Sequence, residues 1–311
     1  GLNFNYPKGA SLVTKYGREI LEKGVKWASG QELVRTVKYI SNKGKPNEEI
    51  EYEWSLKDTD DKGKGFKIIN LDTDSFTFCS DKKYTDQEFG AMLNELNSLY
   101  PDKIRWEPDG MFEKVIVLKA KNYILYDGKK IKIKGSSLKD SKKEKRLQYF
   151  ITDIIKALID DKDEDYLLEM YNDVVREINQ LDSIENWCKK ITVTKKILNP
   201  ERTNEEQVLV AINGRKVQEG DKVWIFPDID GERQEIKKGK PVYLKKTGEA
   251  KMIPNKVWRH MDDFNGSYDK DFLYEKLNKT INIFSSIINV KKFPNYSKSK
   301  QKQLLDKILK G

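Results

Sequence analysis

The sequence contains few histidines and cysteines and lacks any long apolar run. His260 is the only histidine among 311 residues and lies in a stretch that looks structural, which excludes most histidine-dependent chemistry. Cys79 and Cys188 are the only cysteines and match no zinc-binding spacing, so we expect a reducing compartment without a disulfide framework. No run approaches the roughly 18 apolar residues of a membrane span, and no secretion signal opens the chain. These absences predict a cytoplasmic protein without a membrane partner, in the host cytoplasm if it is viral.

The charge balance is strongly basic. Lysine and arginine number 59 against 50 aspartates and glutamates, giving a formal net charge of +9, and charged residues make up 35% of the chain. A basic balance favours a polyanionic partner, because each neutralised phosphate releases counterions. Basic proteins also bind membranes or acidic proteins, so charge by itself leaves the partner open.

Hydropathy patterning in the first 135 residues predicts an α+β sheet domain. Apolar positions have helical spacing over residues 10–28, where Gly17 and Gly24 suggest close packing against another element. Residues 41–64 are polar and rich in glycine, and we expect an exposed loop there. Further along the chain, the pattern indicates strands at 66–70, 75–79, 112–119, 122–126 and 129–134, and a helix at 84–99.

The pattern changes at a polar boundary over residues 136–141. An amphipathic helix follows, with apolar residues at i, i+3 and i+4 from Leu147 to Ile159. We expect further helices at about 166–181 and 271–288 and one strand at 222–226. The sequence therefore predicts a second, mainly helical domain over residues 136–311.

Two aspartates occupy the tip of the hairpin expected between residues 66 and 79. Asp72 and Asp74 are two positions apart, so on a strand their carboxylates share one face and repel each other unless a cation lies between them. Oxygen ligands at this spacing suit Mg²⁺ in phosphoryl transfer. Thr73 and Ser75 would shape the turn. The alternative is ordinary turn chemistry, since a second Asp-Thr-Asp occurs at residues 58–60.

Most of the net charge lies in residues 119–146. This segment has eleven lysines and arginines against three acids. Within residues 130–134, lysines alternate with Ile131 and Ile133, so we expect three ammonium groups on one strand face and two apolar side chains on the other. Such a stripe suits a phosphate backbone, with Tyr123 and Tyr126 placed to pack against sugar or base. The alternative is a solvated lysine edge that discourages strand pairing.

Several stretches resemble the motifs of family B DNA polymerases. Asn-Leu-Asp-Thr-Asp-Ser at 70–75 is similar to their third polymerase motif, Tyr-Gly-Asp-Thr-Asp-Ser, although Asn-Leu replaces Tyr-Gly. Lys-Ala-Lys-Asn-Tyr at 119–123 is similar to the Lys-Lys-x-Tyr motif, one residue short. Lys-Ile-Lys-Gly at 132–135 resembles the step from palm to thumb, and Trp-Glu-Pro-Asp-Gly at 106–110 resembles an acidic palm strand. The helix around residues 16–18 resembles a palm helix, and residues 213–217, 220–223 and the helix from 271 resemble the thumb end.

The resemblance, which is greatest to phage polymerases, implies a fold and a site. Residues 1–135 would form the C-terminal part of an α+β palm with an antiparallel sheet, and residues 136–311 a mainly helical thumb. The implied activity is DNA-directed nucleotidyl transfer with two Mg²⁺ or Mn²⁺ ions, acting on primer–template DNA and dNTP. Asp72 and Asp74 would be the catalytic metal ligands, and Glu107 and Asp109 accessory acids. The residues implied to contact DNA are Lys119, Lys121, Tyr123, Lys132, Lys134 and Gly135.

The resemblance also implies missing parts. The first and second polymerase motifs, the fingers and the exonuclease have no counterpart, and Gly1 coincides with the glycine that closes the second motif. We therefore expect one chain of a split polymerase, inactive without an N-terminal chain that carries these parts. A proteolysed, intein-processed or truncated polymerase would have the same sequence. The alternatives are a non-catalytic DNA-binding or assembly subunit and an RNA-templated polymerase.

Two further stretches have competing interpretations. Residues 95–101, Glu-Leu-Asn-Ser-Leu-Tyr-Pro, mimic the first polymerase motif but follow the aspartate hairpin instead of preceding it. We therefore expect a helix C-terminus there. The tail at residues 301–309 would bind a sliding clamp or form an ordinary amphipathic helix.

Overall fold

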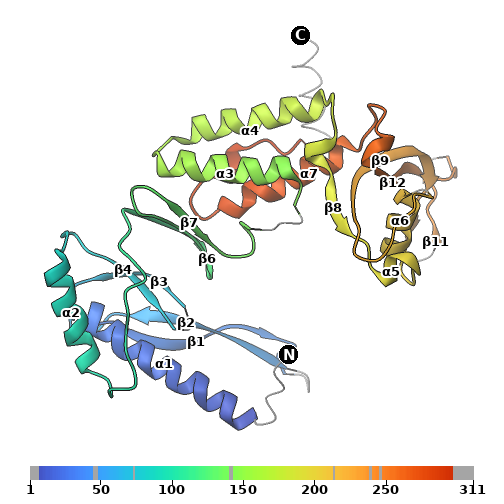
Figure 1. The fold of residues 1–311 in the computed structure, drawn as a ribbon. Coiled ribbons are helices and arrows are strands. Elements are labelled where there is room, and N and C mark those ends of the chain that lie inside the picture. Colours follow the sequence, from blue (N-terminus) through green and yellow to red (C-terminus); the bar gives the residue numbers. More distant parts are fainter. Residues whose placement is uncertain are drawn as a thin grey trace. The chain divides into compact units, whose positions relative to one another are not determined.

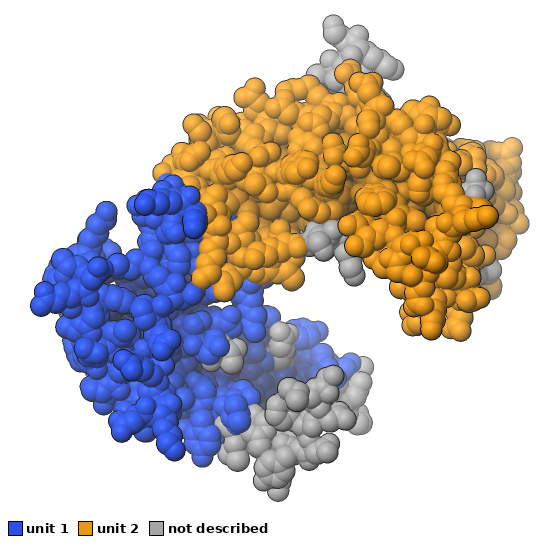
Figure 2. All heavy atoms as spheres, in the orientation of Figure 1, with its two compact units in different colours: residues 1–130 blue, residues 131–311 orange. Residues whose placement is uncertain are grey.

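The computed structural model describes residues 7–44, 48–72, 74–139, 143–212, 214–237, 240–244 and 247–296. These residues form two compact units, residues 1–130 and 131–311, each of which is considered by itself (Figure 2). Helices and antiparallel sheets occur in both units, which confirms the α+β class (Figure 1). Residue 73 and the tail at 301–309, with its expected clamp contact, lie outside the described residues.

Helix α1 (Pro7–Ser29) forms one layer of the first unit, where a helix was expected, and contacts strands β1, β3 and β4. Its buried positions include Leu21 and Val25. The close packing expected at Gly24 is present, since an added Cβ would lie 2.9 Å from Cε1 of Phe76. The same expectation at Gly17 is wrong, because an added Cβ there would meet nothing within 4 Å.

The loop expected over residues 41–64 is wrong at residues 49–57, which form a strand. Strands β1 (Glu32–Ser41) and β2 (Glu49–Lys57) pair antiparallel as a two-stranded hairpin. Ile50, Tyr52 and Trp54 alternate with glutamates, a period-2 pattern typical of a strand. The charges and the neighbouring glycines concealed this signal. Residues 58–64 do form a loop, in which Asp61 Oδ1 accepts a hydrogen bond of 2.9 Å from Gly63 N.

The remaining elements of the first unit confirm the expected order. Strands β3 (Lys67–Leu71) and β4 (Phe76–Cys79) form a hairpin, and β5 (Lys114–Lys119) and β6 (Asn122–Tyr126) form another. Helix α2 (Asp86–Ser98) lies between the two hairpins in sequence. Thr85 and Glu88 form a capping box at its start, with Glu88 N donating to Thr85 Oγ1 at 3.2 Å.

The stretch that mimics the first polymerase motif is the end of helix α2, as expected. The helix ends at Ser98, and Pro101 follows shortly after. Glu95 points to structural partners: its carboxylate lies 2.6 Å from Lys64 Nζ and accepts a hydrogen bond of 3.1 Å from Trp27 Nε1. These contacts tie the end of α2 to the end of α1.

Three helices build the core of the second unit. Helices α3 (Lys145–Ile159) and α4 (Glu164–Asn179) follow strand β7 (Ile131–Lys134) and its turn, and both contact α7 (Lys270–Ile281). The expected apolar stripe of α3 is buried from Leu147 to Ile159. The last helix is shorter than expected, because the 3-10 turn η3 (Asn282–Phe284) follows it directly.

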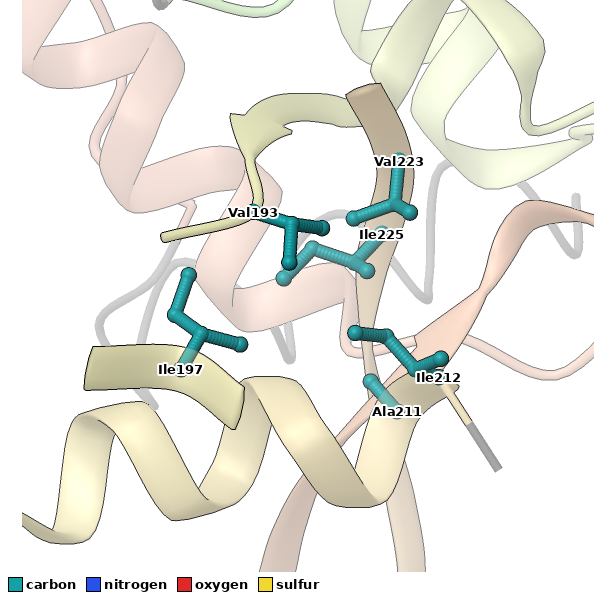
Figure 3. Close-up of a cluster of buried hydrophobic side chains, with 6 residues drawn as sticks. All are labelled: Val193, Ile197, Ala211, Ile212, Val223 and Ile225. Atoms are coloured by element: carbon teal, nitrogen blue, oxygen red, sulfur yellow. The ribbon is translucent and has the colours of Figure 1, made fainter. Parts of the chain in front are cut away.

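A three-stranded antiparallel sheet accompanies these helices, in the order β12-β9-β8. Its strands are β8 (Lys189–Thr192), β9 (Lys222–Gln234) and β12 (Met252–His260). Helices α5 (Lys195–Leu198) and α6 (Thr203–Ile212) lie against it around a small core (Figure 3). That core consists of Val193, Ile197, Ala211, Ile212, Val223 and Ile225. Strand β9 was expected only over residues 222–226, and neither β8 nor β12 was expected.

The single histidine has a structural role, and the two cysteines do not form a disulfide. His260 Nδ1 accepts a hydrogen bond of 3.3 Å from Asp262 N at the short helix η2 (Met261–Asp263). Cys79 is exposed and Cys188 is buried, both as free thiols, and burial raises the pKa of Cys188 to about 12. None of the helices in the described part of the chain is both long and apolar enough for a membrane span.

Candidate active site

The aspartate pair lies at the turn of the β3–β4 hairpin. Leu71 pairs with Phe76, and Asp72 N donates a hydrogen bond of 2.9 Å to the carbonyl of Ser75. This bond closes the turn and leaves Asp74 at its exposed tip. Asp72 is partly shielded, with 24% of its side chain exposed. The expected hairpin with acids at its tip is therefore confirmed as local structure.

Lys121 brings the Lys-Ala-Lys-Asn-Tyr segment at residues 119–123 to this hairpin. It occupies the tight β5–β6 turn with a positive φ of 62°, and its ammonium lies 3.6 Å from Asp72 Oδ1. Asn122 holds the turn from inside, donating from Nδ2 to the carbonyl of Ala120 at 3.0 Å. Lys119 is exposed and Tyr123 is half-buried on the two strands beside this turn. Segments far apart in the sequence therefore meet at Asp72.

An aromatic cluster packs against the β3–β4 hairpin. Phe66 stacks on Phe78 with ring centroids 4.4 Å apart, and Phe76 meets Trp106 edge-on at 5.0 Å. Gly24 of α1 allows this contact, because a Cβ there would also lie 3.1 Å from the Trp106 ring. Rigid packing of this kind fixes the position of strand β4 and hence of the turn that carries the aspartates.

Glu107 and Asp109, which were expected to be accessory acids, follow Trp106 in the chain and are exposed. Trp106 is held in place by Asn97, which accepts from Trp106 N at 2.6 Å and donates to its carbonyl at 3.1 Å. Within the described ranges, no group of three or more histidine, cysteine, aspartate or glutamate side chains is arranged to hold a metal. The structure therefore does not join Glu107 and Asp109 to the aspartate pair as a ligand set.

The donor chemistry of the hairpin suits Mg²⁺ in part. Asp72 and Asp74 offer carboxylate oxygens, the ligands that Mg²⁺ takes in proteins together with water and substrate phosphates. Two carboxylates make an incomplete set, and Lys121 supplies a compensating positive charge to Asp72. The pair therefore fits Mg²⁺ in donor type, and no third acidic side chain among the described residues joins it.

The three other DNA-binding candidates lie in the second unit. Lys132 and Lys134 are on β7, and Gly135 follows with a φ of 110°, a conformation that favours glycine. Because β7 is a strand, Lys132 and Lys134 lie on one face and Ile131 and Ile133 on the other, as expected, while Lys130 precedes the strand. Neither face is fully buried, since Ile131 is 37% exposed and Lys134 is half-buried.

A comparison with protein-family models decides the family. The model of DNA polymerase family B matches residues 6–219, more than half of the chain. This chain belongs to DNA polymerase family B. The match includes the aspartate hairpin and residues 119–123 and 130–134 of this polymerase chain. It supports a DNA-polymerase-related function that involves DNA and dNTP. No match was found among the curated proteins.

The sequence did not reveal two features of the polymerase chain that position the site. The contact of Lys121 with Asp72 joins two hairpins and has no local signal. The ring packing at Gly24 was signalled only as a glycine within an apolar stripe, without an indication of its partner.

Proposed function

We propose that this chain supplies the carboxylate pair and part of the primer–template grip of a DNA-directed DNA polymerase. The observation that carries the proposal is the 3.6 Å approach of Lys121 to Asp72. It places the lysine of the motif that grips DNA beside the carboxylates of the third polymerase motif. The contact joins residues of two separate hairpins at one place in the first unit.

In this proposal, Asp74 would hold two Mg²⁺ or Mn²⁺ ions, and Asp72 would be a further ligand or lie directly beside the ligands. Such ions, when bound, activate the attacking oxygen of the primer and stabilise the leaving group. Lys119, Lys121 and Tyr123 orient the primer end, and Lys132, Lys134 and Gly135 follow the duplex. Glu107 and Asp109 add negative electrostatic potential near the ions without coordinating them. Orientation and charge stabilisation account for most of the catalysis of phosphoryl transfer, so each group acts by position.

We further assign the first unit to the C-terminal part of the palm and the second to the thumb, with a boundary near residue 135. The carboxylate pair lacks a third acidic ligand among the described residues. We therefore propose that the first motif, the fingers and the exonuclease must be added before the chain synthesises DNA. These parts would belong to a separate polypeptide or to another segment of a longer one.

Primer extension with Mg²⁺ tests this proposal. The chain is assayed alone and with an N-terminal family B half that carries the exonuclease, the fingers and the first motif. We expect extension only from the mixture, and a loss of about a thousandfold or more with Asp72→Asn and Asp74→Asn together, the scale of lost charge stabilisation. Asp58→Asn with Asp60→Asn is the matched control, because it changes the other Asp-Thr-Asp of the same unit.

The possible outcomes of this assay distinguish the proposed polymerase function from its alternatives. Extension by the chain alone contradicts the need for added parts. Undiminished extension by the Asp72 and Asp74 variant would mean that the chain is a non-catalytic DNA-binding or assembly subunit. Preference for an RNA template over a DNA template would identify an RNA-templated polymerase with the same palm.

A further inference from the structure

The β1–β2 hairpin of the first unit has one polar and one apolar face. Residues that pair across two antiparallel strands lie on the same face. The polar face carries Thr36 opposite Glu53, and a shift of register after Val37 brings Tyr39 to this face as well. The other face, called the apolar face below, consists of Arg35, Val37 and Ile40 opposite Trp54, Tyr52 and Ile50. The apolar face therefore contains two aromatic rings and one arginine, and no acid.

The apolar face is left largely in solvent. It is half-buried only at its root, near Leu56, whereas Val37 is 52% exposed and Tyr52 is 41% exposed. The neighbouring β3–β4 hairpin differs, because its Phe76 packs edge-on against Trp106. A soluble chain rarely exposes a contiguous row of large apolar side chains unless that row is a binding surface. We therefore take the apolar face as an interface whose occupant has to be identified.

Helix α1 lies beside this hairpin and extends the exposed surface (Figure 1). The guanidinium of Arg18 on α1 lies 4.4 Å from the centroid of the Trp54 ring. Next to Arg18, an added Cβ at Gly17 would meet nothing within 4 Å, and Val13 is 73% exposed one turn earlier. The first half of α1 therefore also has room for a further element, in contrast to the close packing at Gly24.

The chemistry of the surface favours a protein over single-stranded nucleic acid. Single strands bind by stacking bases on aromatic rings along a basic groove. Here guanidinium groups already cover one side of both rings, since Arg35 lies 3.6 Å from the centroid of Tyr52 and Arg18 lies over Trp54. The other positions of the face are aliphatic. Tryptophan, tyrosine and arginine are the residues that contribute most to binding between proteins.

The charge of the surface argues against a second copy of this chain as the occupant. A twofold interface brings the same patch of both copies together. The apolar face and Arg18 together carry two positive charges and no negative one. Two copies would therefore place arginines against arginines in an apolar interface, and like charges across an interface are unfavourable. The occupant that fits has apolar side chains with carboxylates opposite Arg18 and Arg35.

Helix α1 connects this surface to the aspartate hairpin. Gly24, six residues after Arg18, packs against Phe76 of strand β4. An occupant of the apolar face therefore lies against the same helix that supports the turn with Asp72 and Asp74. That carboxylate pair lacks a third acidic ligand among the described residues, and the proposed function assigns the missing ligand to an added polymerase part.

We propose that the apolar face and Arg18 are the docking surface for the polymerase part that carries the first motif. That part binds through an apolar segment whose carboxylates pair with Arg18 and Arg35. The inference rests on the proposed function, because the identity of the partner comes from it. It adds the surface of this chain that receives the partner and the chemistry of the segment that the partner presents.

Biolayer interferometry between the full chain and the N-terminal half used for primer extension tests the proposal. Tyr52→Thr removes a ring from the apolar face and keeps a residue that favours strands. Tyr39→Thr is the matched control, because it removes the same ring from the polar face of the same hairpin. We expect Tyr52→Thr to raise the dissociation constant about thirtyfold, as for a residue that dominates an interface, and Tyr39→Thr to raise it less than about twofold.

A second pair of variants keeps the test independent of the contact between Arg35 and Tyr52. Val37→Lys places a charge on the apolar face at a position that is already half in solvent, so the free chain should remain folded, as circular dichroism would show. Thr36→Lys adds the same charge to the polar face. We expect Val37→Lys to weaken binding at least tenfold and Thr36→Lys to leave it within about twofold. Arg35→Gln should weaken binding and make it less dependent on salt, because one ion pair with the partner is lost.

Primer extension distinguishes a failure of this inference from a failure of the proposed function. With Tyr52→Thr, extension should be lost at low concentrations of the N-terminal half and return to the parent rate at saturation. If Tyr52→Thr and Val37→Lys bind as tightly as the parent, the docking surface is wrong, although extension by the mixture would still support the proposed function. If these variants bind weakly but the parent mixture does not extend primers, the docking surface stands and the polymerase proposal fails.

Three further results would overturn the docking proposal. The first is a parent chain that does not bind the N-terminal half at all. The second is a dimer of the parent chain in sedimentation that Val37→Lys dissociates, which would make this face an interface between copies. The third is binding of a single-stranded oligonucleotide that Tyr52→Thr abolishes, which would make it a nucleic-acid surface.

Discussion

The ammonium of Lys121 lies 3.6 Å from Oδ1 of Asp72, although the two residues belong to different hairpins of the first unit. The pair is exposed on the lysine side, with 71% of the Lys121 side chain in solvent. Exposed ion pairs contribute only about 0–1 kcal/mol to stability. This contact therefore contributes little to the free energy of unfolding, and its importance is that it places Lys121 beside Asp72.

Lys121→Gln should weaken the use of primer–template DNA more than it lowers the stability of the fold. We expect primer extension with the added polymerase half to need roughly tenfold more primer–template for half-maximal rate, because one phosphate-neutralising charge is lost. The free energy of unfolding should change by less than about 1 kcal/mol. Steady-state kinetics and urea unfolding measure the two effects. Lys129→Gln, at an exposed turn away from the aspartates, is the control, and equal kinetic effects of both changes would contradict the assigned role.

Gly24→Ala should destabilise the first unit. The new Cβ would lie 2.9 Å from Phe76 and 3.1 Å from Trp106, and overpacking a core typically costs about 1–3 kcal/mol. Gly17→Ala is the matched control, because its Cβ would meet nothing within 4 Å. That change should raise stability by about 0.5–1 kcal/mol through helix propensity. Urea unfolding of both variants checks the opposite signs, and a neutral Gly24→Ala would show that the aromatic cluster gives way.

Acid should weaken the capping of α2 over a defined pH range. A hydrogen bond from Lys82, followed by bonds from Thr85, lowers the pKa of Glu88 from its ordinary 4.5 to about 2. Because the folded pKa is depressed, its stabilising effect is full above 4.5 and is lost as pH falls toward 2. Carboxyl-carbon NMR of Glu88 should give a midpoint near 2. Glu88→Ala should reduce the pH dependence of unfolding between these values, and an unchanged dependence would disprove the assignment.

Tyr171→Phe should destabilise the second unit. The Tyr171 hydroxyl lies 2.6 Å from Asn278 Oδ1 and 2.7 Å from the carbonyl of Pro294, inside the core. The single hydroxyl hydrogen satisfies one of these acceptors at a time, and removing it leaves a buried acceptor unsatisfied, which costs about 1–3 kcal/mol. Tyr149→Phe changes an exposed hydroxyl on α3 and should cost less than about 0.5 kcal/mol. Thermal unfolding compares the two, and similar losses would mean that the buried bonds contribute little.

Local sequence patterns were sufficient to predict an element when its apolar periodicity lies within the element itself. The apolar stripe of α3 predicted a buried helix, and β-prone runs around the aspartates predicted the β3–β4 hairpin. The β1–β2 hairpin was missed because its alternation of aromatics and glutamates lies within a polar, glycine-containing stretch. The extension of β9 beyond residue 226 was missed because exposed ribbon residues lack an apolar face.

The sequence by itself determined the identity of the candidate site. The order of acids, lysines and tyrosine at residues 70–75 and 119–123 is a property of the chain. Only the tertiary structure decided which of these groups meet. Lys121 reaches Asp72, whereas Glu107 and Asp109 do not join the aspartates as a ligand set among the described residues. Hairpin packing, set by ring contacts such as that of Phe76 with Trp106, is a long-range property that no local pattern specifies.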